Sequence, residues 1–257
     1  MYNSFKLKKI VLDNFKIFKG IQKIEFVNVD DKKVILIMGN NGSGKTILFN
    51  AIKEGLSSTN EKKSNCFLDT SFDKSLITEN NKWMFCLDGE LITGLYEEHK
   101  EFLTSEVVEK MNEFRLTYLR KDILNFTLGD DGKLDVKRSY GRSVNMLINL
   151  FFLLAVKHFL FKNSFLVFDM LFHNVQADMR IDILTLIMNN CDQLILISSP
   201  LEIENYIHDE TQSVEKIIKN RTSYLKFALT YIPEKEGTEI KQYDWHYISW
   251  RSKWHWR

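Results

Sequence analysis

The chain has 257 residues, of which 44% are apolar, and its 35 Lys and Arg residues nearly balance its 34 Asp and Glu residues. This composition can bury a full core and excludes a chain that is disordered throughout. The formal net charge of +1 provides no global basic field for nucleic acid. Cys66, Cys86 and Cys191 lie far apart and form neither a disulfide framework nor a zinc pattern, so we expect a reducing, cytoplasmic compartment.

No segment of the sequence is predicted to enter a membrane. The basic start of the chain lacks a long apolar segment, so we expect no secretory signal. The most apolar stretch, 144–161, is interrupted by Asn145, Asn149, Lys157 and His158. Because about 20 apolar residues are needed to cross a bilayer, this stretch is predicted to be a buried helix.

The N-terminal part predicts strands followed by a loop and a helix. Alternating apolar residues over 8–15 and 21–27 indicate two paired strands. The continuous apolar run 34–38 indicates a strand that is covered on both faces. A glycine-rich loop follows this strand and leads into a predicted helix over 45–55. The polar stretch 57–65 is predicted to be a loop.

The middle of the chain predicts a hairpin and a surface helix. Asp88-Gly89 separates two β-like runs, 82–87 and 90–95, which is typical of a β-hairpin. Helical spacing of apolar residues predicts one amphipathic helix over 97–114. The further strands predicted here are 116–119 and 123–128, the second ending at the turn 129–132.

Strands and helices alternate in the second half of the chain. A long apolar helix is predicted over 143–161, a strand over 165–168, a helix over 177–190 and a strand over 194–197. This alternation predicts an α/β fold whose parallel sheet is connected by helical crossovers. The last predicted elements form a hairpin of two strands, 223–232 and 239–245.

The strongest motif is a phosphate-binding loop between the predicted strand 34–38 and the helix after it. Residues 39–46 fit G-x-x-x-x-G-K-[ST], and the alternative is a chance glycine-rich turn. In such a loop the backbone N–H groups cradle phosphates, the lysine reaches the β- and γ-phosphates, and the hydroxyl residue binds Mg²⁺. The motif therefore predicts that ATP and Mg²⁺ are bound. The predicted binding residues are Asn40, Asn41, Gly42, Ser43, Gly44, Lys45 and Thr46.

A second nucleotide-binding element is predicted at residues 165–169. This apolar run ends in Asp169, which is the pattern of a strand that carries a carboxylate to Mg²⁺. The alternative is that Asp169 caps a helix. Thr46 and Asp169 are the predicted metal ligands.

Residues 8–18 and 37–46, followed by Asn-Ala-Ile at 50–52, resemble the ATP-binding heads of the SMC and DNA-repair ATPases, a branch of the ABC-type ATPases. The resemblance covers about residues 5–200. It is closest to short relatives from bacterial anti-phage and abortive-infection systems, since no long coiled coil fits between Thr46 and Ser139.

The resemblance implies a P-loop NTPase fold of the ABC-ATPase head type. This fold has a parallel sheet core, an N-terminal antiparallel β-region and a helical signature lobe. The head is expected over 1–200, with 56–138 as a short insertion in place of a coiled coil. Residues 201–257 are expected to form a β-hairpin and a tail that packs on the head or docks a partner.

Ser139-Tyr140-Gly141 stands where the family carries its signature motif. The resemblance implies that Ser139 and Gly141 contact the γ-phosphate held by an opposite subunit, so that ATP joins two heads into a homodimer or heterodimer. The alternative is a helix cap. Lys16 fills a position that lies near the phosphates in relatives, and the alternative for Lys16 is a solvated side chain.

Two departures from the family predict slow or absent hydrolysis. Met170 occupies the position of the glutamate that polarises water, and a thioether accepts no proton. Ser198-Ser199-Pro200 lacks the family's switch histidine. No residue is therefore assigned as catalytic, although His173 is an alternative base in a rival hypothesis of an active ATPase. The family's Mg²⁺-linked Gln has no assigned position.

The last 13 residues are rich in tryptophan and basic residues. Such a segment either packs on the domain, docks an effector protein, or stacks on single-stranded nucleic acid. The four tryptophans are Trp245, Trp250, Trp254 and Trp256. A third hypothesis is a structural DNA-binding head, whose lysines are equally explained as a solvated strand face. These lysines are Lys6, Lys8, Lys9, Lys16, Lys19 and Lys23.

Overall fold

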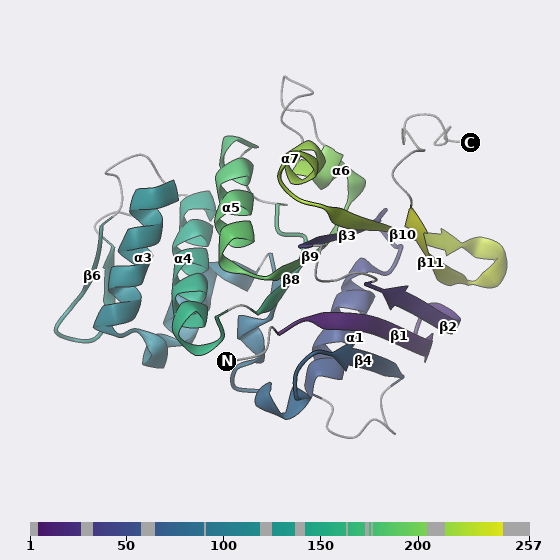
Figure 1. The fold of residues 1–257 in the computed structure, drawn as a ribbon, viewed down its shortest axis with the longest axis horizontal. Helices are drawn as coiled ribbons and strands as arrows, with labels where there is room; N and C mark the ends of the chain where they lie inside the picture. The colour runs from purple at the N-terminus through teal and green to yellow at the C-terminus, as the bar shows by residue number, and fades with distance from the viewer. Residues whose placement is uncertain are drawn as a thin grey trace.

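A six-stranded sheet forms the core of the computed structural model (Figure 1). Its strand order is β11-β10-β3-β9-β8-β5, and all neighbours are parallel except β11 and β10. The described residues are 5–26, 33–57, 65–89, 91–118, 125–136, 142–162, 164–172, 175, 177–204 and 214–243. The strands are β3 (Val34–Gly39), β5 (Cys86–Asp88), β8 (Phe165–Asp169), β9 (Gln193–Ser198), β10 (Tyr224–Ile232) and β11 (Gly237–Tyr243).

The prediction of buried parallel strands is confirmed. Every residue of β3, β8 and β9 is buried, which explains why these strands are continuous apolar runs in the sequence. Because the strands are parallel, the carboxyl ends of β3, β9 and β8 meet at one edge of the sheet. Ligands of open α/β sheets bind at this kind of edge.

A second sheet is antiparallel, as expected for the N-terminal region. It has the order β2-β1-β4, with β1 (Leu7–Phe15), β2 (Phe18–Glu25) and β4 (Cys66–Thr70). Helix α1 (Lys45–Ser57) contacts β1 and β4 on one side and β3, β8 and β9 on the other. The helix that follows the glycine-rich loop is therefore the layer between the two sheets.

Helices form a lobe at the end of the molecule opposite the β10–β11 hairpin (Figure 1). Helices α3 (Ser105–Tyr118), α4 (Arg142–Leu160) and α5 (Ala177–Asn190) stand side by side and contact one another. A small hairpin of β6 (Phe126–Leu128) and β7 (Leu134–Val136) adjoins α3. The short helices are α2 (Leu95–Glu98), α6 (Pro200–Glu204) and α7 (Val214–Arg221), and the 3-10 turns are Lys74–Leu76, Lys82–Met84, Leu91–Gly94, Lys100–Phe102 and Pro233–Lys235.

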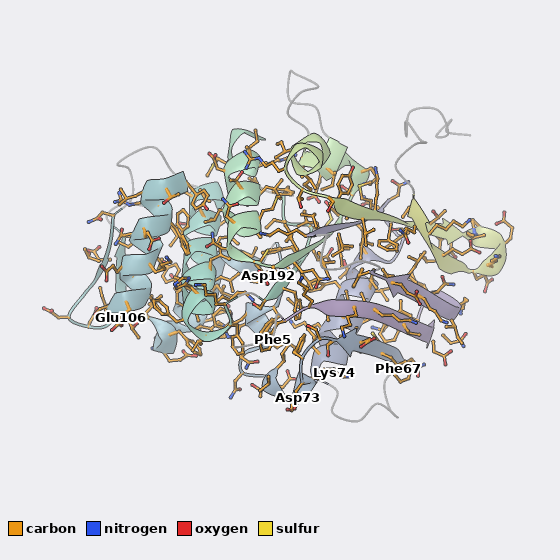
Figure 2. All side chains as sticks on the ribbon, in the orientation of Figure 1. Phe5, Phe67, Asp73, Lys74, Glu106 and Asp192 are labelled. Carbon is orange, nitrogen blue, oxygen red and sulfur yellow. The ribbon has the colours of Figure 1, made fainter. Side chains whose placement is uncertain are left out.

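An aromatic cluster joins the two sheets to the helical lobe. Phe5 lies near the centre of the molecule, ahead of β1 (Figure 2), and its ring stacks on Phe72 with centroids 4.8 Å apart. Phe161, at the end of α4, meets the Phe5 ring edge-on at 5.9 Å. Phe85 contacts Phe165 of β8 at 5.2 Å. These rings bury large apolar areas in one place and so fix the lobe against the sheets.

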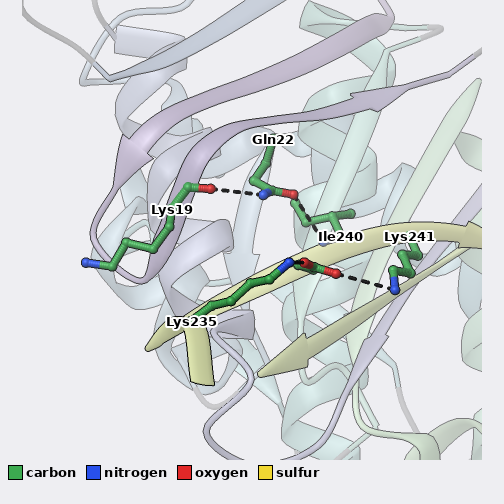
Figure 3. A network of polar contacts seen from close by, with 6 residues as sticks. Lys19, Gln22, Lys235, Ile240 and Lys241 are labelled. Atoms are coloured by element: carbon green, nitrogen blue, oxygen red, sulfur yellow. Dashed lines mark hydrogen bonds and ion pairs between the residues drawn. The ribbon is translucent and has the colours of Figure 1, made fainter. Parts of the chain in front are cut away.

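The C-terminal hairpin is fastened to the N-terminal sheet by a polar network (Figure 3). The Gln22 side-chain amide donates to the Lys19 carbonyl at 3.0 Å, and its oxygen accepts from Ile240 N–H at 3.3 Å. Glu239 of β11 forms ion pairs with Lys235 and with Lys241, the second at 3.3 Å. The hairpin therefore belongs to the core sheet through β10 and contacts β2 through β11.

The predicted hairpin at Asp88-Gly89 is wrong. Strand β5 ends at Asp88 and pairs in parallel with β8, while Leu91–Gly94 is a 3-10 turn. Gly89 N–H donates to the carbonyl of Asp169 at 2.7 Å, so the dipeptide marks the carboxyl end of a core strand. The dipeptide Asp88-Gly89 suits both a hairpin turn and the end of a parallel strand. The partner of β5 is β8, which lies too far along the sequence to be predicted from the local pattern.

The helix predicted over 97–114 and the strand predicted over 116–119 are also corrected. The helix is broken between α2, which ends at Glu98, and α3, which begins at Ser105. Thr104 caps the start of α3, because its hydroxyl and carbonyl accept from the N–H groups of Val107 and Val108. Helix α3 then continues through 116–118 to Tyr118. Within the described part of the predicted strand 123–128, Phe126–Leu128 form β6, which pairs with β7 across the predicted turn 129–132.

The predicted buried helix is confirmed as α4, and it buries a lysine. Lys157 is 2% exposed. Its ammonium donates to the carbonyls of Met84 at 2.9 Å and Phe165 at 3.2 Å, and it lies 4.3 Å from the centroid of the Phe85 ring. No helix in the described ranges is long and apolar enough to span a membrane. Cys66, Cys86 and Cys191 are buried thiols that form no disulfide.

Replacing Lys157 by Met is expected to flatten the pH dependence of stability. Burial lowers the pKa of Lys157 from 10.5 to about 7, so the unfolded state holds a proton that the folded state has lost between these values. The free energy of unfolding should therefore rise with pH by up to about 1.4 kcal/mol per unit from pH 7 to 9. Urea unfolding of wild type and Lys157→Met at several pH values measures this slope.

The matched control is Lys162→Met, which removes an exposed lysine just after the same helix. This control should keep the wild-type slope. An unchanged slope in Lys157→Met would show that the buried amine does not titrate in this range.

Candidate functional site

The phosphate loop leaves the carboxyl end of β3 and has the backbone that its glycines permit. Gly42 and Gly44 have φ values of +80° and +93°, in the left-handed region that favours glycine. A Cβ on Gly39 would lie 2.1 Å from Ser43 Oγ, so the loop folds tightly over its first residue. The motif predicted at 39–46 therefore has the strand–loop–helix context that phosphate binding requires.

Lys45 is folded back over the phosphate loop. Its side chain is 7% exposed, and its ammonium donates to the carbonyls of Gly39 and Asn40, each at 2.9 Å. Burial lowers the pKa of Lys45, and the negative charges of Asp169 and Glu202 oppose this shift. The loop thus holds a buried cation at its centre.

Asp169 ends β8 and meets the start of α1. It is 2% exposed. The Thr46 hydroxyl donates a hydrogen bond to its carboxylate, which brings the two predicted metal ligands together. Burial raises the pKa of Asp169 to about 6, and the hydrogen bond from Thr46 opposes this shift.

Two buried oxygens at this edge fit magnesium and phosphate. Asp169 Oδ1 and Ser43 Oγ are buried and have no hydrogen-bond partner among the described residues. A free carboxylate oxygen beside a hydroxyl is the donor set that Mg²⁺ prefers. Asp169 and Thr46 would hold this ion, whose charge would offset that of bound phosphates. Ser43 and Lys45 would face the phosphates themselves.

Asp88 adds a carboxylate to this edge that the sequence analysis did not assign. It ends β5 and pairs in register with Asp169 on the neighbouring strand. Its negative charge contributes to the raised pKa of Asp169. The only signal in the sequence was a short apolar run before an Asp, and this pattern was interpreted as a hairpin.

Met170 follows Asp169 in a strained backbone conformation. Its φ is +54°, which is uncommon for a residue other than glycine. Its N–H donates to the Ile197 carbonyl at 2.9 Å. A Cβ on Gly89 would lie 2.4 Å from the Met170 carbonyl oxygen, so only glycine fits at position 89. The turn after β8 is therefore held on one side by Ile197 of β9 and on the other by Gly89, which follows β5.

Lys16 lies in the turn between β1 and β2, beside the phosphate loop. It is exposed, and its ammonium lies 5.4 Å from the centroid of the Phe15 ring. The next residue, Ile17, packs on the loop, because a Cβ on Gly44 would lie 2.5 Å from Ile17 Cδ1. Whether Lys16 contacts phosphate stays a prediction.

A buried carboxylate at the end of β9 was missed by the sequence analysis. Glu202 of α6 is 6% exposed and accepts a hydrogen bond from the Ser198 hydroxyl. Arg180 of α5 donates to the Glu202 carbonyl at 3.1 Å and to the Val175 carbonyl at 3.2 Å. The sequence signal was a Glu four residues after a buried strand, which is too common to stand out.

Several predicted site residues lie outside the described residues. These are Ser139, Tyr140 and Gly141 of the signature position, His173, and the tail tryptophans Trp245, Trp250, Trp254 and Trp256. Their assigned roles stay predictions.

The strand–loop–helix motif, with a lysine inside the loop and a carboxylate on a nearby parallel strand, defines a P-loop ATPase. The family described as AAA domain matches residues 9–226, and the chain belongs to this family. No curated protein matches the chain significantly.

Solved structures of SMC heads share the fold. The SMC head domain from Thermotoga maritima superposes with a TM-score of 0.58 at 16% identity, covering 93% of this chain and 100% of that one. An SMC head bound to the C-winged helix domain of ScpA superposes with a TM-score of 0.52 at 13% identity, covering 93% of this chain and 98% of that one. An SMC head with an extended coiled coil, bound to the C-terminal domain of ScpA and derived from Pyrococcus furiosus, gives 0.51 at 11%, covering 93% and 96%. The expected fold, that of an SMC-type ATPase head, is therefore confirmed.

Replacing Asp169 by Asn is expected to stabilise the protein when metal and nucleotide are absent. The pKa of Asp169 is about 6 instead of 3.8, so the folded state binds this proton more tightly than the unfolded state. The free energy of unfolding therefore falls as pH rises from about 4 to about 6, and the loss remains at higher pH. At about 1.4 kcal/mol per pKa unit, Asp169→Asn should gain about 3 kcal/mol at pH 7.5.

Urea unfolding in EDTA at pH 4.5 to 7.5 measures this gain. Asp135→Asn, which changes an exposed aspartate of β7, is the control and should have little effect. With Mg²⁺ and ATP, wild type should become more stable than Asp169→Asn, because only wild type keeps the carboxylate that would bind the metal. If Asp169→Asn and Asp135→Asn changed the free energy of unfolding equally in EDTA, the buried charge of Asp169 would not be unfavourable.

Proposed function

We propose that this SMC-like head binds Mg-ATP in the loop 39–46 and works as an ATP-gated switch. The observation that carries the proposal is the meeting of Lys45, Thr46 and Asp169 at one edge of the sheet, with a buried, unpartnered oxygen on Asp169 and on Ser43. These are the groups that bind phosphates and Mg²⁺ in P-loop proteins.

Hydrolysis by the isolated protein is weak or absent in this proposal. The support is Met170, whose thioether occupies the position where relatives carry a glutamate, and the missing switch histidine after β9. Loss of a general base costs about 10² to 10⁴ in rate. The rival candidate is an active ATPase that couples turnover to DNA or to an effector.

Two heads would pair around ATP. The support is the resemblance of Ser139 and Gly141 to the family's signature position, just ahead of α4 (Arg142–Leu160). In this arrangement the γ-phosphate bound by one head meets the Ser139 hydroxyl and the Gly141 backbone of the other, and a helix N-terminus favours that negative charge.

The paired heads would regulate an effector protein in a bacterial defence complex. The support is the resemblance to short anti-phage relatives, together with the tail that carries Trp245, Trp250, Trp254 and Trp256. SMC heads with this fold have been solved bound to domains of ScpA, a protein partner. For this chain, the tail is the proposed docking segment.

DNA binding through the N-terminal lysines is the weaker hypothesis. Register places Lys9 opposite Glu25 on β2 and opposite Asp69 on β4, and Lys9 forms an ion pair with Glu25 at 2.7 Å. Phe67 of β4, labelled in Figure 2, is exposed on the same sheet. This sheet is therefore mixed in charge, whereas phosphate backbones require clustered cations.

Mg-ATP is expected to stabilise the wild-type protein. A ligand present at 100 times its Kd adds about 2.7 kcal/mol to the free energy of unfolding, which raises Tm. Lys45→Ala should remove most of this shift, because it deletes the cation at the centre of the loop. Thermal unfolding with and without Mg-ATP measures the shift, and Lys100→Ala, an exposed lysine of the helical lobe, is the control.

A wild-type protein that shows no Tm shift at millimolar Mg-ATP, and binds no labelled ATP, would overturn the nucleotide site. A shift that persists in Lys45→Ala would place the nucleotide elsewhere.

ATP-dependent pairing is tested with Gly141→Asp. The added carboxylate would stand against the γ-phosphate of the opposite head, so ATP should no longer promote a dimer. The Mg-ATP shift in Tm should stay, since the loop residues are unchanged. Light scattering with a non-hydrolysable ATP analogue measures the mass, and equal dimer formation by wild type and variant would refute the signature assignment.

A further inference from the structure

We call the side of the sheet where β3, β9 and β8 end the nucleotide edge; it carries the loop 39–46 and Asp169. Glu202 comes late in the sequence but lies at this edge, just after β9. Strand β9 is flanked by β3 on one side and β8 on the other. In the register of this sheet, Met38 pairs with Ser198 and Asp169 pairs with Ile197. The chain that leaves β9 therefore starts between the phosphate loop and Asp169, and Glu202 follows within one turn of α6 (Pro200–Glu204).

The Glu202 side chain is held at this edge from several directions. Its carboxylate accepts from the hydroxyl of Ser198, the last residue of β9. Its N–H donates to the Ser199 carbonyl at 3.1 Å, which fixes the turn. Arg180 binds the Glu202 carbonyl and thereby ties α6 to α5. Among the described side chains, Glu202 is the only glutamate that is buried.

The charge of Glu202 acts on both halves of the nucleotide site. It interacts electrostatically with Lys45 of the phosphate loop and with Asp169 of β8. The terminal phosphate of ATP would occupy the region between these two residues, since the lysine and the Mg²⁺ ligands both address it. Glu202 therefore adds a carboxylate whose charge reaches both Lys45 and Asp169.

The neighbouring residues explain why this role falls to Glu202. Met170, next to Asp169, has no group that takes a proton, and its backbone is fixed by hydrogen bonding to Ile197. A candidate base must be within hydrogen-bond reach of the proton, directly or through one water, and such contacts tighten when substrate binds. Glu202 is a buried carboxylate on α6, which begins just after β9, the strand beside β8.

We propose that Glu202 is the catalytic carboxylate of this head, in place of a glutamate at position 170. The idea rests on the proposed binding of Mg-ATP and assigns the weak turnover to one residue. The water oxygen forms a bond to the γ-phosphorus while the Glu202 carboxylate takes a proton from that water. The bond from the γ-phosphorus to the bridging oxygen breaks, and its electron pair leaves with ADP. Glu202 then returns the proton to solvent.

Glu202→Gln is the central variant, because it keeps the shape of the side chain and removes the base. Its kcat for ATP hydrolysis should fall by about tenfold or more, to the background measured with Lys45→Ala. Its KM and its Mg-ATP shift in Tm should stay close to wild type, since no phosphate contact is lost. Glu109→Gln makes the same chemical change at an exposed site of α3 and should leave kcat unchanged.

Three results would overturn the proposal. The first is a Glu202→Gln variant that hydrolyses ATP at the wild-type rate. The second is a variant that folds but loses the Mg-ATP shift, which would make Glu202 a binding residue. The third is wild-type turnover no higher than that of Lys45→Ala, which removes the role of Glu202 but leaves nucleotide binding intact. Failure of nucleotide binding itself is a separate result, seen as a missing Tm shift in wild type.

Ser198→Ala keeps the test decisive if Glu202→Gln fails to fold. This variant retains the carboxylate but removes the hydroxyl that orients it. Its kcat should fall while its KM and Mg-ATP shift are preserved, and an unchanged kcat would count against the proposal.

Discussion

The parallel pairing of β3, β9 and β8 is the constraint on which the nucleotide edge depends. Each of these strands ends in a residue that is polar or is glycine: Gly39, Ser198 and Asp169. Parallel register brings these three ends to one side of the sheet, although the strands lie far apart in the sequence. The loop, the carboxylate and the turn into α6 meet there because the three strands that carry them are neighbours in parallel register.

This alignment concentrates charge where water is excluded. Lys45, Asp169 and Glu202 are all buried, and the pKa changes of Lys45 and Asp169 show that burial opposes their charged forms. Buried charges weaken a fold unless they are paired or bound. The buried charges therefore make the ligand-free protein less stable. A ligand that supplies phosphates and a divalent cation would pair with these charges and raise the stability.

The sequence predicted those parts of the molecule whose signals are local. The apolar runs of β3, β8 and β9, the loop 39–46 and Asp169 all carry their pattern within a few neighbouring residues. Position in the sheet is not local, so Asp88 was assigned to a hairpin and Glu202 was not assigned at all. Asp88 reaches the site because its strand β5 pairs with β8. Glu202 reaches the site because β9, the strand before it, pairs with β3.

The C-terminal hairpin has a consequence for the order in which the protein folds. Strand β3, which leads into the phosphate loop, is flanked on one side by β9 and on the other by β10, with Val34 opposite Tyr224. Pairings between such distant segments are slow to form, because the intervening chain must first be brought into place. During synthesis from the N-terminus, the loop emerges early but gains its second supporting strand only when β10 has been made. The nucleotide edge is thus among the first parts of the head to be translated and among the last to become rigid.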